Sequence, residues 1–81
     1  MEISYSELYT LFIKEVSKIE NLKQFCLDNQ LENQYPLIVK LMNRTTQKRF
    51  TAIIINVLEK MDYQIEMSHT FLVHKKSDNF L

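Results

Sequence analysis

The stretch FTAIIINVLEKMDYQIEMSHTFLVH, residues 50–74, contains the change of hydrophobic period that decides the fold class. Its first part repeats apolar residues at steps of three and four, the spacing of one helix face: Phe50, Ile53, Ile54, Val57, Leu58 and Met61. Residues 53–55 are β-branched and also suit a strand, but the stripe is too long and too regular for one. We therefore predict a helix that Thr45 or Thr46 caps and that Asp62 ends.

The second part of the stretch has the period of a strand. Residues 63–67 alternate apolar and polar side chains, and so does part of residues 70–74. Such alternation is typical of a strand with one buried face. Because Ser68-His69-Thr70 is a short polar connection between the two runs, the sequence predicts a C-terminal β-hairpin.

A helix near the N-terminus is indicated by Ser4 and Glu7, which have the spacing of a capping box and would start the helix near Tyr5. One apolar stripe follows, formed by Tyr5, Leu8, Leu11, Phe12, Val16 and Ile19. The other side of this helix is charged, with Lys14, Glu15 and Lys18.

Two shorter helices are predicted between these segments. The first ends at Asp28-Asn29, two residues that tolerate the left-handed backbone glycine usually supplies. Its inward residues are Ile19, Leu22, Phe25, Cys26 and, as a further candidate, Leu27. After a polar turn at residues 30–34, the second begins at Pro36, whose fixed φ suits a first helical turn, and stops at Asn43-Arg44. Since the chain has no glycine, other residues must fill every left-handed position.

The predicted fold class is mostly α, a compact bundle of about four short helices with a C-terminal β-hairpin. The 81 residues allow one domain, which we place at residues 1–76, with residues 77–81 as a flexible tail. A single cysteine, Cys26, excludes an internal disulfide and a thiolate metal cluster. Because we find neither a signal peptide nor an apolar run longer than residues 52–55, we predict a cytoplasmic protein.

The sequence predicts no catalytic residue, no metal site and no cofactor, and therefore no enzyme. The only histidines, His69 and His74, lie five residues apart, which places them on opposite faces of an extended strand and argues against a shared metal ion. Without glycine there is neither a phosphate loop nor a dinucleotide fingerprint. The carboxylates are scattered along helices at positions that we expect to be exposed.

The most informative electrostatic feature is an uneven distribution of charge. The formal net charge is zero, yet four cations and no acid lie between Tyr35 and Leu58. Around these cations are Asn, Gln and Thr, the side chains that contact phosphates and base edges. The candidate nucleic-acid-binding residues are Lys40, Asn43, Arg44, Thr46, Gln47, Lys48 and Arg49. The alternative, an ordinary polar connection between two helices, stays open.

The chain contains a predicted helix that ends in a polar turn, Val39-Lys40-Leu41-Met42-Asn43-Arg44. Further on, a second predicted helix leads into an extended segment, at Leu58-Glu59-Lys60-Met61-Asp62-Tyr63. In this order of parts, residues 20–66 resemble small lambda-repressor-like helix-turn-helix regulators of the Cro and Xre type. The resemblance implies that residues 36–43 lie in the major groove of duplex DNA, with Lys40 and Arg44 reaching it.

Two functions are therefore predicted. The first is a small DNA-binding transcriptional regulator, such as a phage, plasmid or antitoxin-type repressor, acting as a homodimer. The excess of Lys, Asn and Ile over Arg, Ala and Gly fits AT-rich coding sequences, which many phages and mobile elements have. The second is a protein-interaction module, such as a phage-encoded inhibitor or adaptor, with a protein target instead of DNA. Its motivation is the charge asymmetry together with aromatic residues such as Tyr5, Tyr9, Phe12, Tyr35 and Tyr63.

Overall fold

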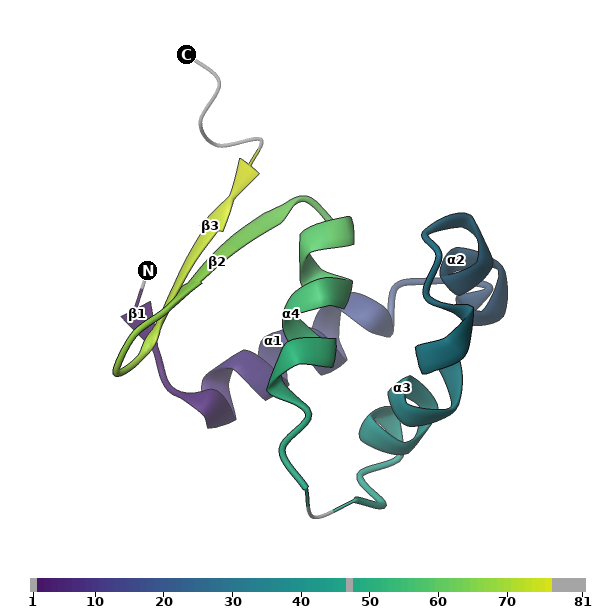
Figure 1. The fold of residues 1–81 in the computed structure, drawn as a ribbon, viewed down its shortest axis with the longest axis horizontal. Coiled ribbons are helices and arrows are strands. Elements are labelled where there is room, and N and C mark those ends of the chain that lie inside the picture. Colours follow the sequence, from purple (N-terminus) through teal and green to yellow (C-terminus); the bar gives the residue numbers. More distant parts are fainter. Residues whose placement is uncertain (1, 47, 77–81) are drawn as a thin grey trace.

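The computed structural model describes residues 2–46 and 48–76, and it contains the predicted four helices and C-terminal hairpin (Figure 1). In chain order the elements are β1 (Glu2–Ile3), α1 (Tyr5–Val16), α2 (Leu22–Asp28), the 3-10 turn η1 (Glu32–Gln34), α3 (Tyr35–Met42), α4 (Thr51–Lys60), β2 (Tyr63–Met67) and β3 (Phe71–Lys75). β1 and η1 are additions to the prediction. The tail predicted at residues 77–81 lies outside the described residues.

The hairpin belongs to a three-stranded antiparallel sheet with the order β1-β3-β2. Met67 pairs with Phe71, so that Ser68-His69-Thr70 forms the loop, as predicted. β1 pairs with the other side of β3, with Ile3 opposite Phe71. A strand of two residues is too short to show a period in the sequence, which is why this third strand was not predicted.

One apolar core joins the sheet to the helices. Figure 1 shows the sheet on one side of α1 and α4, and α2 and α3 on the other. The largest fully buried side chains come from all four helices: Leu8, Phe12, Cys26, Ile38, Leu41, Ile54, Val57 and Leu58. α4 is a helix through the β-branched residues 53–55, as its stripe predicts. Within residues 2–46 and 48–76, no helix combines the length and the apolar character needed to cross a membrane.

Local capping explains the start of α1 but not that of α4. The predicted capping box is confirmed, since the Glu7 N–H donates to the Ser4 hydroxyl and the Ser4 N–H donates to the Glu7 carboxylate. The predicted threonine cap of α4 is wrong: its N-cap is Phe50, which makes no side-chain capping bond. The Thr46 hydroxyl instead accepts the N–H of Lys48. Because Phe50 packs against the core, tertiary contact determines where α4 begins.

Left-handed backbone occurs at three non-glycine residues, Gln30, Arg44 and Asp62, with φ of 56°, 56° and 75°. Asp62 follows the end of α4, as predicted. The left-handed cap predicted at Asp28-Asn29 is wrong, because Asn29 has φ of −113°. Its side-chain amide donates to the Phe25 carbonyl, which satisfies one acceptor at the end of α2, and the reversal of the chain occurs one residue later.

The burial of two helical side chains is the opposite of what the sequence predicts. Leu27, predicted to face inward, is 49% exposed. Glu15, assigned to the charged side of α1, is buried with 7% exposure. For Glu15 the reason is a contact with the hairpin at the C-terminal end of α1, which the apolar stripe of the helix does not reveal. Glu15 accepts a hydrogen bond from Tyr63 of β2 and feels the charge of Lys75 of β3.

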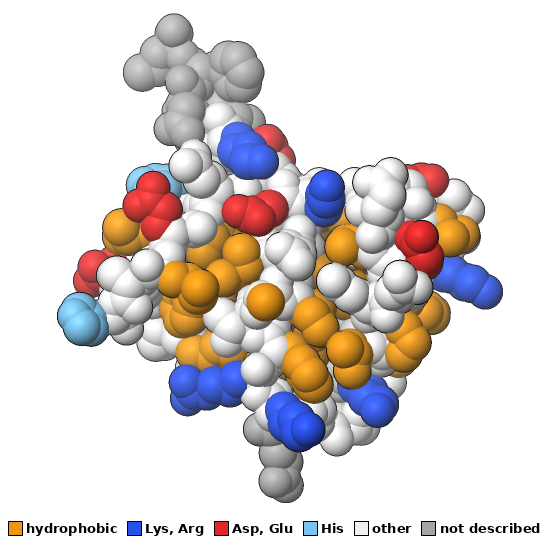
Figure 2. Space-filling view, viewed as in Figure 1, with side chains coloured by type: hydrophobic (Ala, Val, Ile, Leu, Met, Phe, Trp, Pro, Cys, Tyr) orange, Lys and Arg blue, Asp and Glu red, His pale blue; other side chains and the backbone are white. Residues whose placement is uncertain are grey.

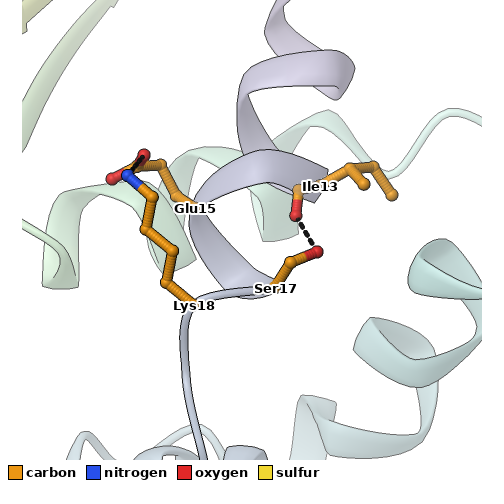
Figure 3. A network of polar contacts seen from close by, with 4 residues as sticks. All are labelled: Ile13, Glu15, Ser17 and Lys18. Carbon is orange, nitrogen blue, oxygen red and sulfur yellow. Dashed lines mark hydrogen bonds and ion pairs between the residues drawn. The ribbon is translucent and has the colours of Figure 1, made fainter.

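Glu15 also forms an ion pair at the C-terminal end of α1, where its Oε2 lies 2.9 Å from Lys18 Nζ (Figure 3). In the same turn the Ser17 hydroxyl donates to the Ile13 carbonyl. The hydrogen bond from Lys18 lowers the pKa of Glu15 below its ordinary value, against the opposing effect of burial. The ionised form is therefore favoured by folding.

This lowered pKa predicts acid-sensitive stability. Its contribution is fully present above the unfolded-state pKa, 4.5, and is lost as the pH falls through the lower folded-state pKa. We expect Glu15→Gln to reduce the free energy of unfolding near neutral pH by about 1 kcal/mol and to flatten its fall below pH 4.5. Urea denaturation at several pH values measures both effects, with the exposed Glu20→Gln as control. An unchanged acid dependence in Glu15→Gln would contradict the assignment.

Candidate nucleic-acid interface

The predicted binding residues lie at the end of α3 and in the connection to α4. Lys40 is in the last turn of α3, Asn43 is its C-cap, and Arg44, Lys48 and Arg49 follow in the connection. These five side chains are exposed, and Thr46 is partly buried. Gln47 lies outside the described residues. We call Lys40, Arg44, Lys48 and Arg49 the basic cluster.

The guanidinium groups of the two arginines in the basic cluster lie over tyrosine rings of α1. The guanidinium carbon of Arg49 lies 4.6 Å from the centre of the Tyr5 ring, and that of Arg44 lies 5.8 Å from the centre of the Tyr9 ring. The two tyrosine rings, one helical turn apart, have centres separated by 6.0 Å. The first two turns of α1 are therefore an aromatic support for cations that come from another part of the chain.

One hydrogen bond joins the end of α3 to α1, and two more close that end of α3. The Tyr9 hydroxyl donates to the Leu41 carbonyl, which joins α1 to the last turn of α3. The Thr45 N–H and hydroxyl both donate to the Lys40 carbonyl, at 3.1 and 3.3 Å, which closes the end of α3. The left-handed backbone of Arg44 lies inside this closing turn. The position of the Arg44 side chain over Tyr9 thus follows from how α3 ends.

No acid neutralises the basic cluster within the part of the chain that is described. There the one ion pair is Lys18–Glu15, at the other end of α1. Figure 2 shows Lys and Arg side chains without acidic neighbours along the lower edge of the visible face, whereas acidic and basic side chains are mixed over its upper half. Burial raises the pKa of Tyr5, with a smaller contribution from Tyr9, so its ring is neutral at physiological pH.

This arrangement is suited to binding an anion. An arginine whose charge is held over an aromatic ring by a cation–π contact still has guanidinium N–H groups available to a ligand. Those groups match the oxygens of a phosphate or carboxylate in pairs. The contact also restricts a long side chain before binding, which reduces the entropy lost when the anion binds.

The helices to which the family resemblance assigns DNA binding differ from a helix-turn-helix in their connection and in their exposed charges. The connection between α2 and α3 spans residues 29–34 and contains η1, so it is longer than the turn of three or four residues in a helix-turn-helix. Within α3, the exposed residues are Pro36 and Lys40. The exposed face of α3 therefore offers one cation, and the rest of the basic cluster lies beyond the helix.

Sequence reasoning found the cations of this site but not their aromatic support. Tyr5 and Tyr9 are four residues apart on a helix, a spacing that places them side by side. Nothing in the sequence connects that pair to a segment more than thirty positions away, since the contact depends on how α1 packs against α3.

The side chains that could bind a metal ion are not grouped in the described part of the chain. Across residues 2–46 and 48–76, no group of three or more His, Cys, Asp or Glu side chains is placed to hold a metal ion. His69 lies in the hairpin loop and His74 on β3, and both are exposed. Burial raises the pKa of the Cys26 thiol, which keeps it protonated.

Comparison with known proteins gives no match for this chain, whether with family models, curated proteins or solved structures.

Proposed function

We propose that the protein is a small DNA-binding transcriptional regulator that contacts the phosphate backbone of duplex DNA through the basic cluster. The observation that carries the proposal is the pair of arginines that lie over Tyr5 and Tyr9 and that form no ion pair among the described residues. Charges that serve only solubility have no need of an aromatic support, whereas phosphate-binding arginines gain from a fixed orientation.

In this proposal, contacts to phosphates position the protein, and few residues read bases. Lys40 and Asn43, at the exposed end of α3, are the side chains best placed to reach a base edge. A single copy offers a small contact surface. A homodimer that binds two half-sites would provide enough contacts for a sequence-specific regulator.

The test is binding of the purified protein to a pool of duplex fragments from its source genome, at two salt concentrations. If four phosphates are contacted, the affinity should fall about 150-fold between about 50 and about 200 mM salt, because each contact releases counterions. Recovery of a discrete fragment would identify the operator. Recovery of no fragment at the lower salt concentration would contradict the proposal.

A second candidate, a protein-interaction module, is favoured by the composition of the same face. Figure 2 shows apolar side chains in the middle of this face, directly beside the basic edge. Tyrosine and arginine, which form the stacked pairs, are also the residues most enriched at binding hot spots in protein interfaces. An acidic protein partner that binds this face, with no affinity for duplex DNA at either salt concentration, would support this candidate.

A further inference from the structure

A polar cleft lies between the α2–η1 segment and α4, at the end of α4 opposite to the basic cluster. Its volume is about 570 Å³, within the range of small-ligand sites. Arg49 precedes α4 and Lys60 ends it, so the length of the helix, about 15 Å, separates the cleft from the basic cluster. The cleft is therefore a separate site.

Carboxamides dominate the lining of the cleft. Asn29, Gln30 and Gln34 come from the segment after α2, and Asn56 faces them from α4. A carboxamide offers both a donor and an acceptor, the same pair of groups that a peptide unit presents. The Asn29 amide already donates to the Phe25 carbonyl, so the Asn29 Oδ1 atom and the other three carboxamides can pair with successive N–H and C=O groups of an extended peptide.

One acceptor of these carboxamides is left unpaired by the described part of the fold. The Oε1 atom of Gln34 is buried and accepts no hydrogen bond among the described residues. Buried acceptors without a donor are uncommon in native proteins and need an explanation. Rotation of this side chain toward the cleft would allow Oε1 to accept an N–H from a ligand.

The chain turns at the edge of the cleft. Gln30 has a left-handed backbone just after α2, where the Leu31 N–H donates to the Cys26 carbonyl at 2.7 Å and closes the helix. Asn29, Gln30 and Gln34, on either side of this closed turn, all line the cleft.

The charges of the cleft indicate the rest of the ligand. Lys60 and Lys76 lie in the lining with Glu59, and none of the three forms an ion pair within residues 2–46 and 48–76. Lys76 Nζ donates to the Glu59 carbonyl at 3.4 Å. Two cations suit a single carboxylate, whereas the adjacent Glu59 carboxylate would repel a phosphate that carries two charges.

The lining also excludes some ligands. It contains one apolar residue, Leu31, and no aromatic ring, so a nucleobase would have nothing to stack on. From these observations we propose that the cleft binds an extended peptide segment with a free carboxylate. The carboxamides pair with its backbone, and Lys60 and Lys76 bind the carboxylate.

The experiment is a titration of the ¹⁵N-labelled full chain with acetyl-tetra-alanine, which has a free C-terminal carboxylate. Side-chain amide signals of Gln34 and Asn56 report on the cleft directly. We expect these signals to shift with the free acid and not with the same peptide as its C-terminal amide. Equal shifts with both peptides, shifts with inorganic phosphate instead, or no shift would each overturn the proposal.

Variants separate binding from folding. Lys60→Gln with Lys76→Gln should weaken peptide binding at least about tenfold, whereas Lys14→Gln with Lys23→Gln, which makes the same change of charge elsewhere, should not. Gln34→Leu should also abolish peptide binding, while its helical circular dichroism stays that of the parent chain. If the Gln34→Leu variant does not fold, the double variant of Lys60 and Lys76 still tests the proposal. Unchanged peptide binding in that double variant contradicts it.

Discussion

Replacement of Lys40, Arg44, Lys48 and Arg49 together by glutamate is expected to abolish binding to duplex DNA. All four side chains are exposed and none pairs with an acid in the described part of the chain, so each is available to a phosphate. Reversal replaces four favourable contacts by four repulsive ones and removes the counterion release that drives binding. The measurement is fluorescence anisotropy with a labelled duplex at low salt.

A matched control distinguishes a local contact from a general effect of charge. Reversal of Lys14, Lys23, Lys60 and Lys76 gives the same net charge on other surfaces of the molecule. This control should retain most of the affinity at equal salt. Equal losses in both variants would show that the basic cluster has no special role, and retained affinity in the first would contradict the assigned surface.

A pair of substitutions that preserves charge tests the contact between the arginines and the tyrosine rings. Arg44→Lys with Arg49→Lys keeps the net charge but removes the flat guanidinium groups that lie over Tyr9 and Tyr5. If stacked arginines bind phosphate in pairs of hydrogen bonds, the affinity should fall about tenfold while the salt dependence stays the same. An unchanged affinity would mean that charge alone accounts for binding.

The largest effect on stability is expected from Phe12→Ala. Phe12 has no exposed surface and lies in the core between α1 and its neighbours. Removal of a fully buried phenylalanine ring costs about 3–5 kcal/mol, through lost burial and the cavity that remains. A domain of this length has a total stability of about 4–12 kcal/mol, so a large fraction of the variant should be unfolded.

Urea denaturation followed by circular dichroism measures this cost. Leu27→Ala is the control, because Leu27 is half exposed at the surface of α2 and alanine favours a helix. It should change the free energy of unfolding by less than about 0.5 kcal/mol. If Phe12→Ala and Leu27→Ala were equally stable, the arrangement of the core around α1 would be wrong.

Features that form within one helix or hairpin could be predicted from the sequence. The Ser4–Glu7 capping box, the proline in the first turn of α3 and the stripe of α4 each lie within a few residues and were confirmed. The same is true of the hairpin, whose two alternating runs and short loop are adjacent in the chain. Short-range sterics, hydrogen bonding and hydrophobic period determine these features, so they need no knowledge of the rest of the fold.

Features that depend on contacts between distant elements were missed. The start of α4 is set by the packing of Phe50 and not by a threonine cap, and Glu15 is buried where it meets Tyr63 of the hairpin. In each case a competing contact overrode a reasonable propensity.

The candidate sites divide in the same way. The sequence by itself determined four helices, a hairpin and an acid-free basic segment, because composition and period are properties of neighbouring residues. Tertiary structure alone decided that Arg44 and Arg49 lie over tyrosine rings of α1, that β1 completes the sheet and that four carboxamides line one cleft. These contacts join residues distant in the chain, and such pairings form only when the apolar faces of the helices and the sheet pack into one core.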